Sequence, residues 1–319
     1  MPDYPDDLDH PLTRGDASLL GIGWRELTGP LWRSPYRGSH VWSATDPQLP
    51  LQRALDAACL LPEGGALGGW AAAKIAGVDE LDGAPTGRPL PVPLCLPPRV
   101  TRRRGPTVVP WRSPLDAADV VEIGGVPVTR TVRTAFDLAR HGDLEVAVSC
   151  LDVLARGRPG LLDEVAAYAA ARPGWGGVPA ARRALALASP RARSMRETAL
   201  RLFWHLECGL PVPEVNASVL GHGGWLLGMG DLLDAESGLL SEYDGAGHRD
   251  EVQHALDNAR EEGFEDAGLV VVRFGNLDLV RHRTRAKQRL LAGHARARSA
   301  RQRDWLWLPG PLPPPTPHW

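Results

Sequence analysis

The chain lacks the features that mark membrane, secreted and zinc-binding proteins. No stretch approaches the roughly 18 consecutive apolar residues of a membrane-spanning helix. The acidic N-terminal stretch MPDYPDDLDH has no apolar core of the kind that a signal peptide needs. The four cysteines are scattered, with neither a CxxC motif nor a paired His/Cys spacing, which argues against a disulfide framework or a zinc site. We therefore expect a soluble cytoplasmic protein with no membrane partner.

An excess of charge of one sign is also missing. The formal net charge of -2 over 319 residues gives no global indication of a nucleic-acid partner, so any such surface must be local. The apolar residues, 43% of the chain, are enough for two or three domains with separate cores. The order of helical and extended patterns predicts an α/β multidomain protein.

The most informative stretch runs from residue 228 to 248, GMGDLLDAESGLLSEYDGAGH. Two pairs of leucines mark the apolar ends of two short strands, and the residues AESG between them are turn material, so we expect a β-hairpin. Each of the two symmetric loops that fit places Asp234 opposite Leu239. Counting outward from that pair places Asp231 directly opposite Glu242.

Opposed residues on one face of an antiparallel pair have Cβ atoms about 4.5–5.5 Å apart, and like charges there are destabilising. Side chains alternate along a strand, so Asp244 shares a face with Glu242, and three carboxylates gather with Asp231. Such a cluster suits a hard divalent cation bound through oxygen. The alternative is that this face is solvated and the acids point into water.

A wider set of residues shares the spacing of a known family. The set consists of Asp231, residues 242–245 (EYDG), His248, Asp257, Arg260 and the apolar strand 269–274 (LVVVRF). Over about residues 190 to 290 the chain resembles an uncharacterised domain-of-unknown-function family. That family is related to very-short-patch repair endonucleases and belongs to the PD-(D/E)xK, restriction-endonuclease-like superfamily.

The resemblance implies roles for Asp231 and Glu242, and the endonuclease hypothesis built on it assigns further roles to Asp244, Glu197 and His248. Asp231 and Glu242 would hold Mg²⁺ or Mn²⁺, which would activate a water for attack on a phosphodiester and neutralise charge in the transition state. Asp244 and Glu197 would act as auxiliary acids. His248 would transfer a proton or contact the phosphate.

One position departs from the superfamily motif, which has a lysine where this chain has Asp244. The chain has only two lysines, Lys74 and Lys287, and neither lies near the motif. Another group, such as His248 or Arg260, would have to steady the phosphate or the water. Aspartate at this position is also usual in the related uncharacterised family, so membership is unaffected while cleavage itself is in question.

Residues 1–48 predict a degenerate winged-helix-like segment. A helical pattern from 17 to 27 is followed by an extended stretch from 36 to 42. Arg33, Arg37 and His40 would lie on or near the wing, where such residues commonly bind phosphate. Three glycines interrupt the helices, so the alternative is a packing module without a DNA-reading role.

Residues 49–178 predict an α/β middle domain. The expected elements are helices over 51–60, 66–76, 143–155 and 160–171, strands over 90–96 and 107–111, and a strand region over 120–128 with a turn at Gly124-Gly125. The loop between the first two strands carries Arg102, Arg103 and Arg104. These arginines could contact a phosphate backbone, and the alternative is an ordinary solvated loop.

A second resemblance covers about residues 10 to 160. The stretches 125–129 (GVPVT), 133–139 (RTAFDLA) and 150–152 (CLD) resemble AbiEi-type antitoxin-like proteins, in which a winged helix precedes an α/β domain. The resemblance implies DNA-binding repressor or antitoxin ancestry and names no catalytic residue. The same residues have structural explanations, because Thr129 or Thr131 can cap the following helix.

Residues 190–292 predict a restriction-endonuclease-like domain of order αβββαβα, whose final helix spans 277–292. Its first helix opens with a capping box from Ser194 to Glu197. Glu197 could therefore return to the Ser194 amide, or it could place an acid near the metal, as the superfamily often does. Residues 293–319 are a basic and Pro/Trp-rich tail, which we expect to be disordered or polyproline II-like.

Three hypotheses follow. The first is a Mg²⁺-dependent endonuclease-like protein that hydrolyses phosphodiester bonds of DNA. The second is a non-catalytic DNA-binding regulator or antitoxin-like protein that retains the nuclease fold and works with a partner protein of a toxin-antitoxin or defence system. The third is an interaction scaffold that uses the Pro/Trp-rich tail.

Overall fold

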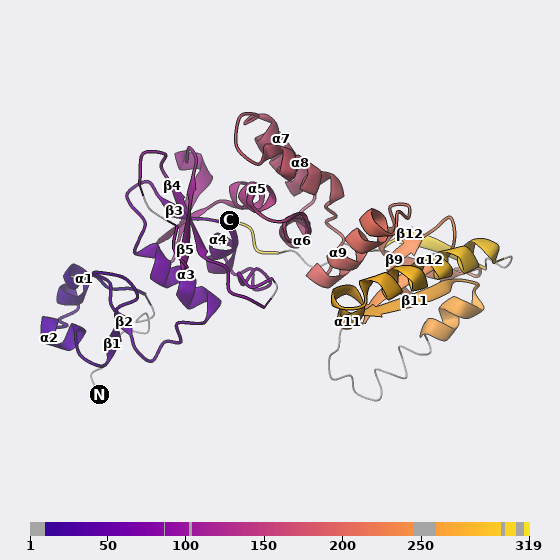
Figure 1. The fold of residues 1–319 in the computed structure, drawn as a ribbon, viewed down its shortest axis with the longest axis horizontal. Coiled ribbons are helices and arrows are strands. Elements are labelled where there is room, and N and C mark those ends of the chain that lie inside the picture. The colour runs from indigo at the N-terminus through magenta and orange to yellow at the C-terminus, as the bar shows by residue number, and fades with distance from the viewer. Residues whose placement is uncertain (1–9, 86, 102–103, 245–259, 301–303, 311–315) are drawn as a thin grey trace. The chain divides into compact units, whose positions relative to one another are not determined.

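The computed structural model describes residues 10–85, 87–101, 104–244, 260–300, 304–310 and 316–319. The protein is a mixed α/β molecule with several sheets (Figure 1). It divides into two compact units. The first unit comprises Met1–His141, Glu164–Pro179 and Pro317–Trp319, and the second comprises Gly142–Asp163 and Ala180–Thr316. Among the described residues, no helix is long and apolar enough to span a membrane.

The first unit begins with short elements. They are the helices α1 (Arg14–Leu19) and α2 (Trp24–Leu27) and the antiparallel strands β1 (Trp32–Arg33) and β2 (Val41–Trp42). Thr13 and Asp16 cap α1 reciprocally. The expected helix over 17–27 is wrong as a single element, because it breaks at Gly21, whose φ of +76° favours glycine.

A five-stranded sheet forms the rest of the first unit, in the order β5-β4-β3-β7-β6. Its strands are β3 (Ala66–Leu67), β4 (Val92–Leu96), β5 (Val108–Arg112), β6 (Val120–Ile123) and β7 (Val126–Thr129). Its helices are α3 (Pro50–Ala58), α4 (Gly69–Ile75) and α5 (Thr131–His141), with a 3₁₀ turn at Ala117–Asp119. Apolar residues of α3, α4 and the strands share one core.

Two glycine positions explain local features of this sheet. Gly124 and Gly125 have φ of +54° and +75°, which matches a two-residue hairpin loop between β6 and β7 and confirms the predicted turn. The expected helix over 66–76 is wrong at its start. Gly69 has φ +53°, and a Cβ there would lie 2.7 Å from the ring of Trp111, so the chain turns at this point and the helix begins only after β3.

The second unit contains a five-stranded sheet in the order β11-β10-β9-β8-β12. Its strands are β8 (Glu214–Gly221), β9 (Leu226–Asp234), β10 (Leu239–Asp244), β11 (Val270–Gly275) and β12 (Trp305–Pro309). Neighbouring strands are antiparallel except β10 and β11, which are parallel. Leu232 and Leu233 belong to different cores, as expected for alternating side chains.

Helices cover both faces of this sheet. One core contains side chains of α9 (Met195–Leu202), a π-helical turn (Phe203–Glu207), α11 (Asn276–Val280) and α12 (Arg283–Ser299). The other contains Phe264, from a helix whose described part is residues 260–266. Helix α6 (Leu144–Ala155) also belongs to the second unit, and α7 (Leu161–Ala170) and α8 (Val178–Leu187) are divided between the units. Figure 1 shows α12 lying along β11.

The expectation of an unstructured tail from residue 293 is wrong for the described residues. Helix α12 continues to Ser299, and β12 adds an edge strand to the sheet through antiparallel pairing with β8. Trp305 is buried in the core on the Phe264 side. At the end of the chain, the backbone of Trp319 exchanges hydrogen bonds with Thr131. The apolar content of the segment therefore outweighs its prolines.

Candidate active site

The β9–β10 hairpin has the predicted register. Leu239 pairs with Asp234, and the pairing continues to Ser241 with Leu232, so Asp231 and Glu242 come next. Asp234 holds the turn, because its carboxylate accepts hydrogen bonds from the backbone amide of Glu236 at 3.1 Å and from the hydroxyl of Ser237 at 2.5 Å. The hairpin and its register are confirmed.

Asp231 is a partly buried acid whose carboxylate reaches the neighbouring strand. Its Oδ2 accepts a hydrogen bond of 2.7 Å from the backbone amide of Tyr243. Burial raises the pKa of Asp231 to about 7, and the negative charges of Glu197 and Glu242 add to the increase. The Tyr243 amide and Arg260 act in the opposite direction. Asp231 therefore lies among two other acids, each from a different element.

Glu242 is buried, and arginines bind both of its carboxylate oxygens. Oε1 accepts from Arg260 at 3.0 Å, and Oε2 accepts from Arg273 at 3.2 Å. Arg273 is the parallel neighbour of Glu242 on β11, and its second contact is to Glu261 at 2.9 Å. Glu242 is thus buried rather than solvated, whereas Asp231 is only partly buried. Guanidinium groups supply the expected positive charge.

Glu197 lies at the N-terminal cap of α9, but its carboxylate does not return to the Ser194 amide as the capping box predicted. The Ser194 hydroxyl accepts a hydrogen bond of 3.1 Å from the backbone amide of Glu197, which confirms Ser194 as the N-cap of α9. The Glu197 carboxylate accepts from the backbone amide of Arg193, not of Ser194, at 3.0 Å. It also accepts from the side-chain amide of Asn216 at 2.8 Å. Its charge still raises the pKa of Asp231, so the cap lies beside the acidic cluster.

Asn216 is a buried residue of β8 with an unusual backbone. Its φ is +52°, and no other described residue except glycine has positive φ. Its neighbours Val215 and Ala217 pair with Leu232 and Gly230, which places Asn216 across from Asp231. Its side chain also donates to the Arg191 carbonyl at 2.8 Å. A non-glycine residue held in this conformation is strained, and such strain is often concentrated at functional sites.

Two of the remaining predicted site residues are described, and both are exposed. Asp244 is exposed at the end of β10. Arg104 is exposed in its loop. His248, Arg102 and Arg103 lie outside the described residues, as does Asp257.

The oxygen donors at this site are of the kind that binds Mg²⁺. Their arrangement, however, is not that of a complete set of Mg²⁺ ligands. Asp231 and Glu242 supply hard carboxylate oxygens, which divalent cations prefer. Within the described ranges, however, no three His, Cys, Asp or Glu side chains are grouped so that they could hold a metal ion. Glu242 would have to exchange an arginine contact for the ion.

Sequence reasoning missed Arg273 and Asn216. A signal existed for Arg273, because it is the only charged residue in the apolar strand 269–274, where an ion requires a partner. For Asn216 the sequence offers no comparable signal, since its role depends on a backbone conformation that the sequence does not specify.

Two residues of the stretch 133–139, Arg133 and Asp137, belong to a buried network of charges in the first unit. Arg133, 1% exposed, donates to Asp137 at 2.8 Å and to Asp119 at 2.9 Å. Its third side-chain partner, the Ser113 hydroxyl, lies 2.7 Å away. Arg140 binds the other oxygen of Asp137 at 2.7 Å. These charged side chains bind one another inside the fold. Their contacts fix the orientation of α5 relative to the segments that contain Ser113 and Asp119.

Comparison with known proteins adds relatives without a described activity. No family model matches the chain. Uncharacterized proteins from two strains of Mycobacterium tuberculosis are 28% identical over 235 residues, which cover 73% of this chain and 85% of theirs. A crystal structure of a Mycobacterium tuberculosis protein covers 57% of this chain and 78% of its own, with 20% identity and a TM-score of 0.30. Function has to be inferred from the residues of the site.

Proposed function

We propose that the second unit is an endonuclease-like domain that hydrolyses phosphodiester bonds of DNA with the aid of Mg²⁺ or Mn²⁺. One observation carries the proposal: Asp231 of β9 follows the hairpin register opposite Glu242 of β10, and it lies across from Asn216 of β8, whose side chain binds the carboxylate of Glu197 of α9. Three carboxylates from three elements are costly to gather. Such concentrations of charge are typical of sites that bind a cation or transfer protons.

The order of elements supports the same proposal. Helix α9 is followed by the three antiparallel strands β8, β9 and β10, then by the 260–266 helix, the parallel strand β11 and the helices α11 and α12. This is the αβββαβα order expected of the restriction-endonuclease-like superfamily. We propose on this basis that the second unit is related to the very-short-patch repair endonucleases.

Under this proposal Asp231 and Glu242 would hold the ion, and the ion would supply an activated water and positive charge for the phosphate. Glu197 adds negative charge to the cluster and is fixed in place by Asn216. Arg260 and Arg273, which bind Glu242 here, supply the positive charge that the motif lysine would otherwise bring. Guanidinium groups suit phosphate oxygens because they can bind two of them at once.

Nicking of supercoiled plasmid DNA by the full chain tests this function. We expect nicking with Mg²⁺ or Mn²⁺, none with EDTA, and none by the Asp231→Asn variant, whose shape is nearly unchanged. Glu236→Gln, which alters an exposed acid of the same hairpin, is the matched control and should retain activity. Metal-independent nicking, or equal nicking by Asp231→Asn, would contradict the proposal.

A second candidate is supported by a specific observation. Both oxygens of Glu242 are already bound by arginines, and Asp244 replaces the motif lysine, so the domain could bind DNA without cleaving it. We propose as the alternative a DNA-binding regulator of antitoxin type, whose winged-helix-like segment is α1, α2, β1 and β2 and which acts with a partner protein of a toxin-antitoxin or defence system.

Mobility shifts of duplex DNA separate the two candidates. The regulator should bind duplex DNA equally with Mg²⁺ and with EDTA, show strong salt dependence, and never nick plasmid. The nuclease should nick, and the Asp231→Asn variant should bind without nicking. If neither binding nor nicking occurs with plasmid, linear duplex or single-stranded DNA, both candidates fail.

A further inference from the structure

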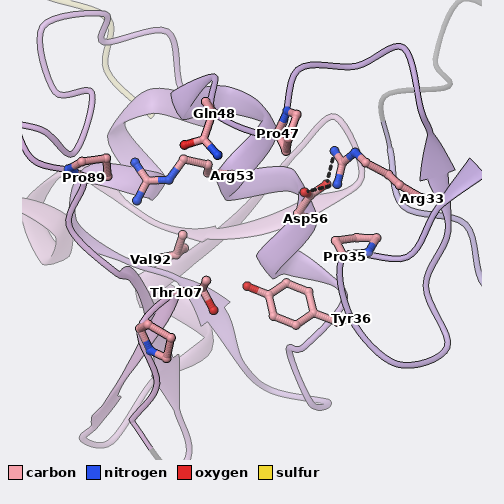
Figure 2. A pocket seen from close by; sticks show the side chains of 11 residues that line it. Arg33, Pro35, Tyr36, Pro47, Gln48, Arg53, Asp56, Pro89, Val92 and Thr107 are labelled. Carbon is pink, nitrogen blue, oxygen red and sulfur yellow. Dashed lines mark hydrogen bonds and ion pairs between the residues drawn. The ribbon is translucent and has the colours of Figure 1, made fainter.

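A hollow in the first unit is separate from the acidic cluster. It has a volume of about 390 Å³ and is lined by side chains from the segments 33–36, 47–56, 89–92 and 106–107. Figure 2 shows these side chains arranged around it. Small-molecule sites commonly have volumes of about 300–1,000 Å³, so the hollow has the size of a ligand site.

One wall of the hollow is a fixed and neutral ion pair. Arg33 donates to both oxygens of Asp56, at 2.6 and 3.1 Å, and Figure 2 shows the two dashed contacts. Gln52 adds a hydrogen bond of 2.8 Å to the same carboxylate. The bidentate pair holds β1 against α3. Arg33 was expected to bind phosphate on the wing, but its guanidinium already binds Asp56 within the fold.

A second arginine brings a positive charge that no acid neutralises directly. The guanidinium of Arg53 lies 4.9 Å from the ring centre of Trp70, and one of its nitrogens donates to the Leu90 carbonyl. Throughout the described part of the chain, no carboxylate lies within ion-pair distance of Arg53. Burial lowers the pKa of Arg53 from its ordinary value, and the negative charge of Asp82, which is not part of the lining, acts in the opposite direction. Because Arg33 and Asp56 form an ion pair, Arg53 leaves the charged side chains of the lining with one net positive charge.

The rest of the lining is mostly apolar and rigid. It consists of Pro35, Pro47, Pro89, Pro106, Val92 and Tyr36, together with the polar side chains of Gln48 and Thr107. Figure 2 shows the hydroxyl end of the Tyr36 ring pointing toward Thr107. Proline rings have little conformational freedom to lose, so such a site is largely preformed. Flat apolar rings pack well against surfaces of this kind.

We propose that this hollow binds a small organic anion that carries one flat ring system. Its anionic group, a carboxylate or a phosphate, binds the guanidinium of Arg53. Its ring packs against the prolines and Tyr36. The proposal depends neither on DNA cleavage nor on the acidic cluster, since all of its residues belong to the first unit.

Calorimetric titration of the full chain with two matched probe pairs tests the site. Indole-3-acetate is compared with the neutral indole-3-acetamide, and adenosine 5′-monophosphate with adenosine. The charged member of at least one pair should bind about tenfold or more tightly than its neutral partner, because a charge-assisted contact is lost in the partner. The pair that responds shows whether the group is a carboxylate or a phosphate. Equal binding within both pairs, or no binding of any probe at millimolar concentration, overturns the proposal.

Variants locate the binding. Arg53→Gln should weaken the binding of the charged probe about 10- to 100-fold. Arg25→Gln, which removes an exposed arginine of α2 that does not line the hollow, should leave the binding of this probe unchanged. Thr107→Trp fills the hollow from its exposed rim without removing charge and should also abolish binding. This variant decides the matter if Arg53→Gln fails to fold by circular dichroism. Undiminished binding by a folded Arg53→Gln or Thr107→Trp variant contradicts the proposed site.

Discussion

Glu242 illustrates how a buried acid is stabilised by partners that are distant in the sequence. Its carboxylate is removed from water, a change that is costly unless opposite charge compensates for it. Arg260 and Arg273 provide that charge from a helix and a neighbouring strand. The three side chains therefore link the β9–β10 hairpin to the elements that follow it, and removing one partner should affect the others.

We expect Glu242→Gln to lower the free energy of unfolding of the second unit by about 1–3 kcal/mol, because it leaves two guanidinium groups without their carboxylate. Urea denaturation of the variant measures the loss. Arg273→Met in the same background gives a double-mutant cycle with an expected coupling of about 0.5–3 kcal/mol. Independent, additive effects of the two substitutions would show that the pair does not contribute to stability.

Asp231 should make the second unit less stable as the pH rises. Its pKa is raised from 3.8 to about 7, first by burial and then by Glu197 and Glu242, against the Tyr243 amide and Arg260. Between these two values the folded state retains a proton that the unfolded state has lost, so stability decreases with pH over this window. The decrease is at most about 4 kcal/mol, since each pKa unit corresponds to about 1.4 kcal/mol.

The variant Asp231→Asn tests this dependence, because its amide oxygen can still accept from Tyr243 but cannot ionise. In buffer with EDTA, urea denaturation should show the variant more stable than the original chain at pH 8 and about equal to it at pH 4. Glu236→Gln serves as the exposed control. Parallel stability profiles for the original chain and the Asn variant from pH 4 to pH 8 would mean that Asp231 ionises normally.

At this scale the sequence predicted the opposition of Asp231 and Glu242 but not what balances it. The opposition follows from local geometry, since a four-residue turn and strict alternation determine the register. The contact from Arg273 requires parallel pairing of β10 with β11, across a segment of about 25 residues. No local pattern specifies which strand becomes the neighbour of β10. Local sequence patterns therefore did not identify the arginine partners, and a metal ion was the expected source of positive charge.

At the scale of elements, α5 is oriented by a buried network of charge. Arg133 and Asp137 lie one turn apart on the helix and are almost completely buried. Arg133→Met should lower stability of the first unit by about 3–5 kcal/mol, because it leaves Asp137 and Asp119 with one fewer counter-charge in a dry environment. Urea denaturation or hydrogen exchange at the α5 amides gives the measurement.

The matched control for this substitution is Arg130→Met, which replaces an exposed arginine just before the same helix and should change stability by less than about 0.5 kcal/mol. Similar small losses for both variants would contradict a structural role for the network. Sequence reasoning recognised these residues through a family resemblance and through their apolar neighbours. It could not identify Asp119 and Ser113 as partners, since they precede α5 by a strand pair.

At the scale of the whole molecule, the end of the chain contributes to both units. Composition suggested a disordered tail, because proline-rich segments rarely form cores. The alternation of Trp305, Leu306, Trp307 and Leu308 was the contrary signal, and it corresponds to a strand with one buried and one exposed face. Pairing with β8 could not be foreseen, since strand order within a sheet depends on contacts that are distant in the sequence.

Two tryptophans of this segment should therefore affect different unfolding transitions. Trp305 is buried in the core of the second unit, and its replacement by alanine should cost about 3–5 kcal/mol there. Trp319 is partly buried against the core of the first unit, where its indole also donates to the Thr129 carbonyl at 2.5 Å. Its smaller burial implies a smaller cost, about 1–3 kcal/mol, to the first unit.

Scanning calorimetry combined with hydrogen exchange can assign each loss to a unit. Trp305→Ala should reduce protection in β8 and β9, and Trp319→Ala should reduce it in α5, while Leu308→Ala, on the exposed face of β12, should change neither. A tail without a structural role would leave all three variants alike. Loss confined to the predicted unit in each case would show that this segment stabilises both units through separate contacts, because one chain end then supplies a strand to one sheet and a capping indole to the other core.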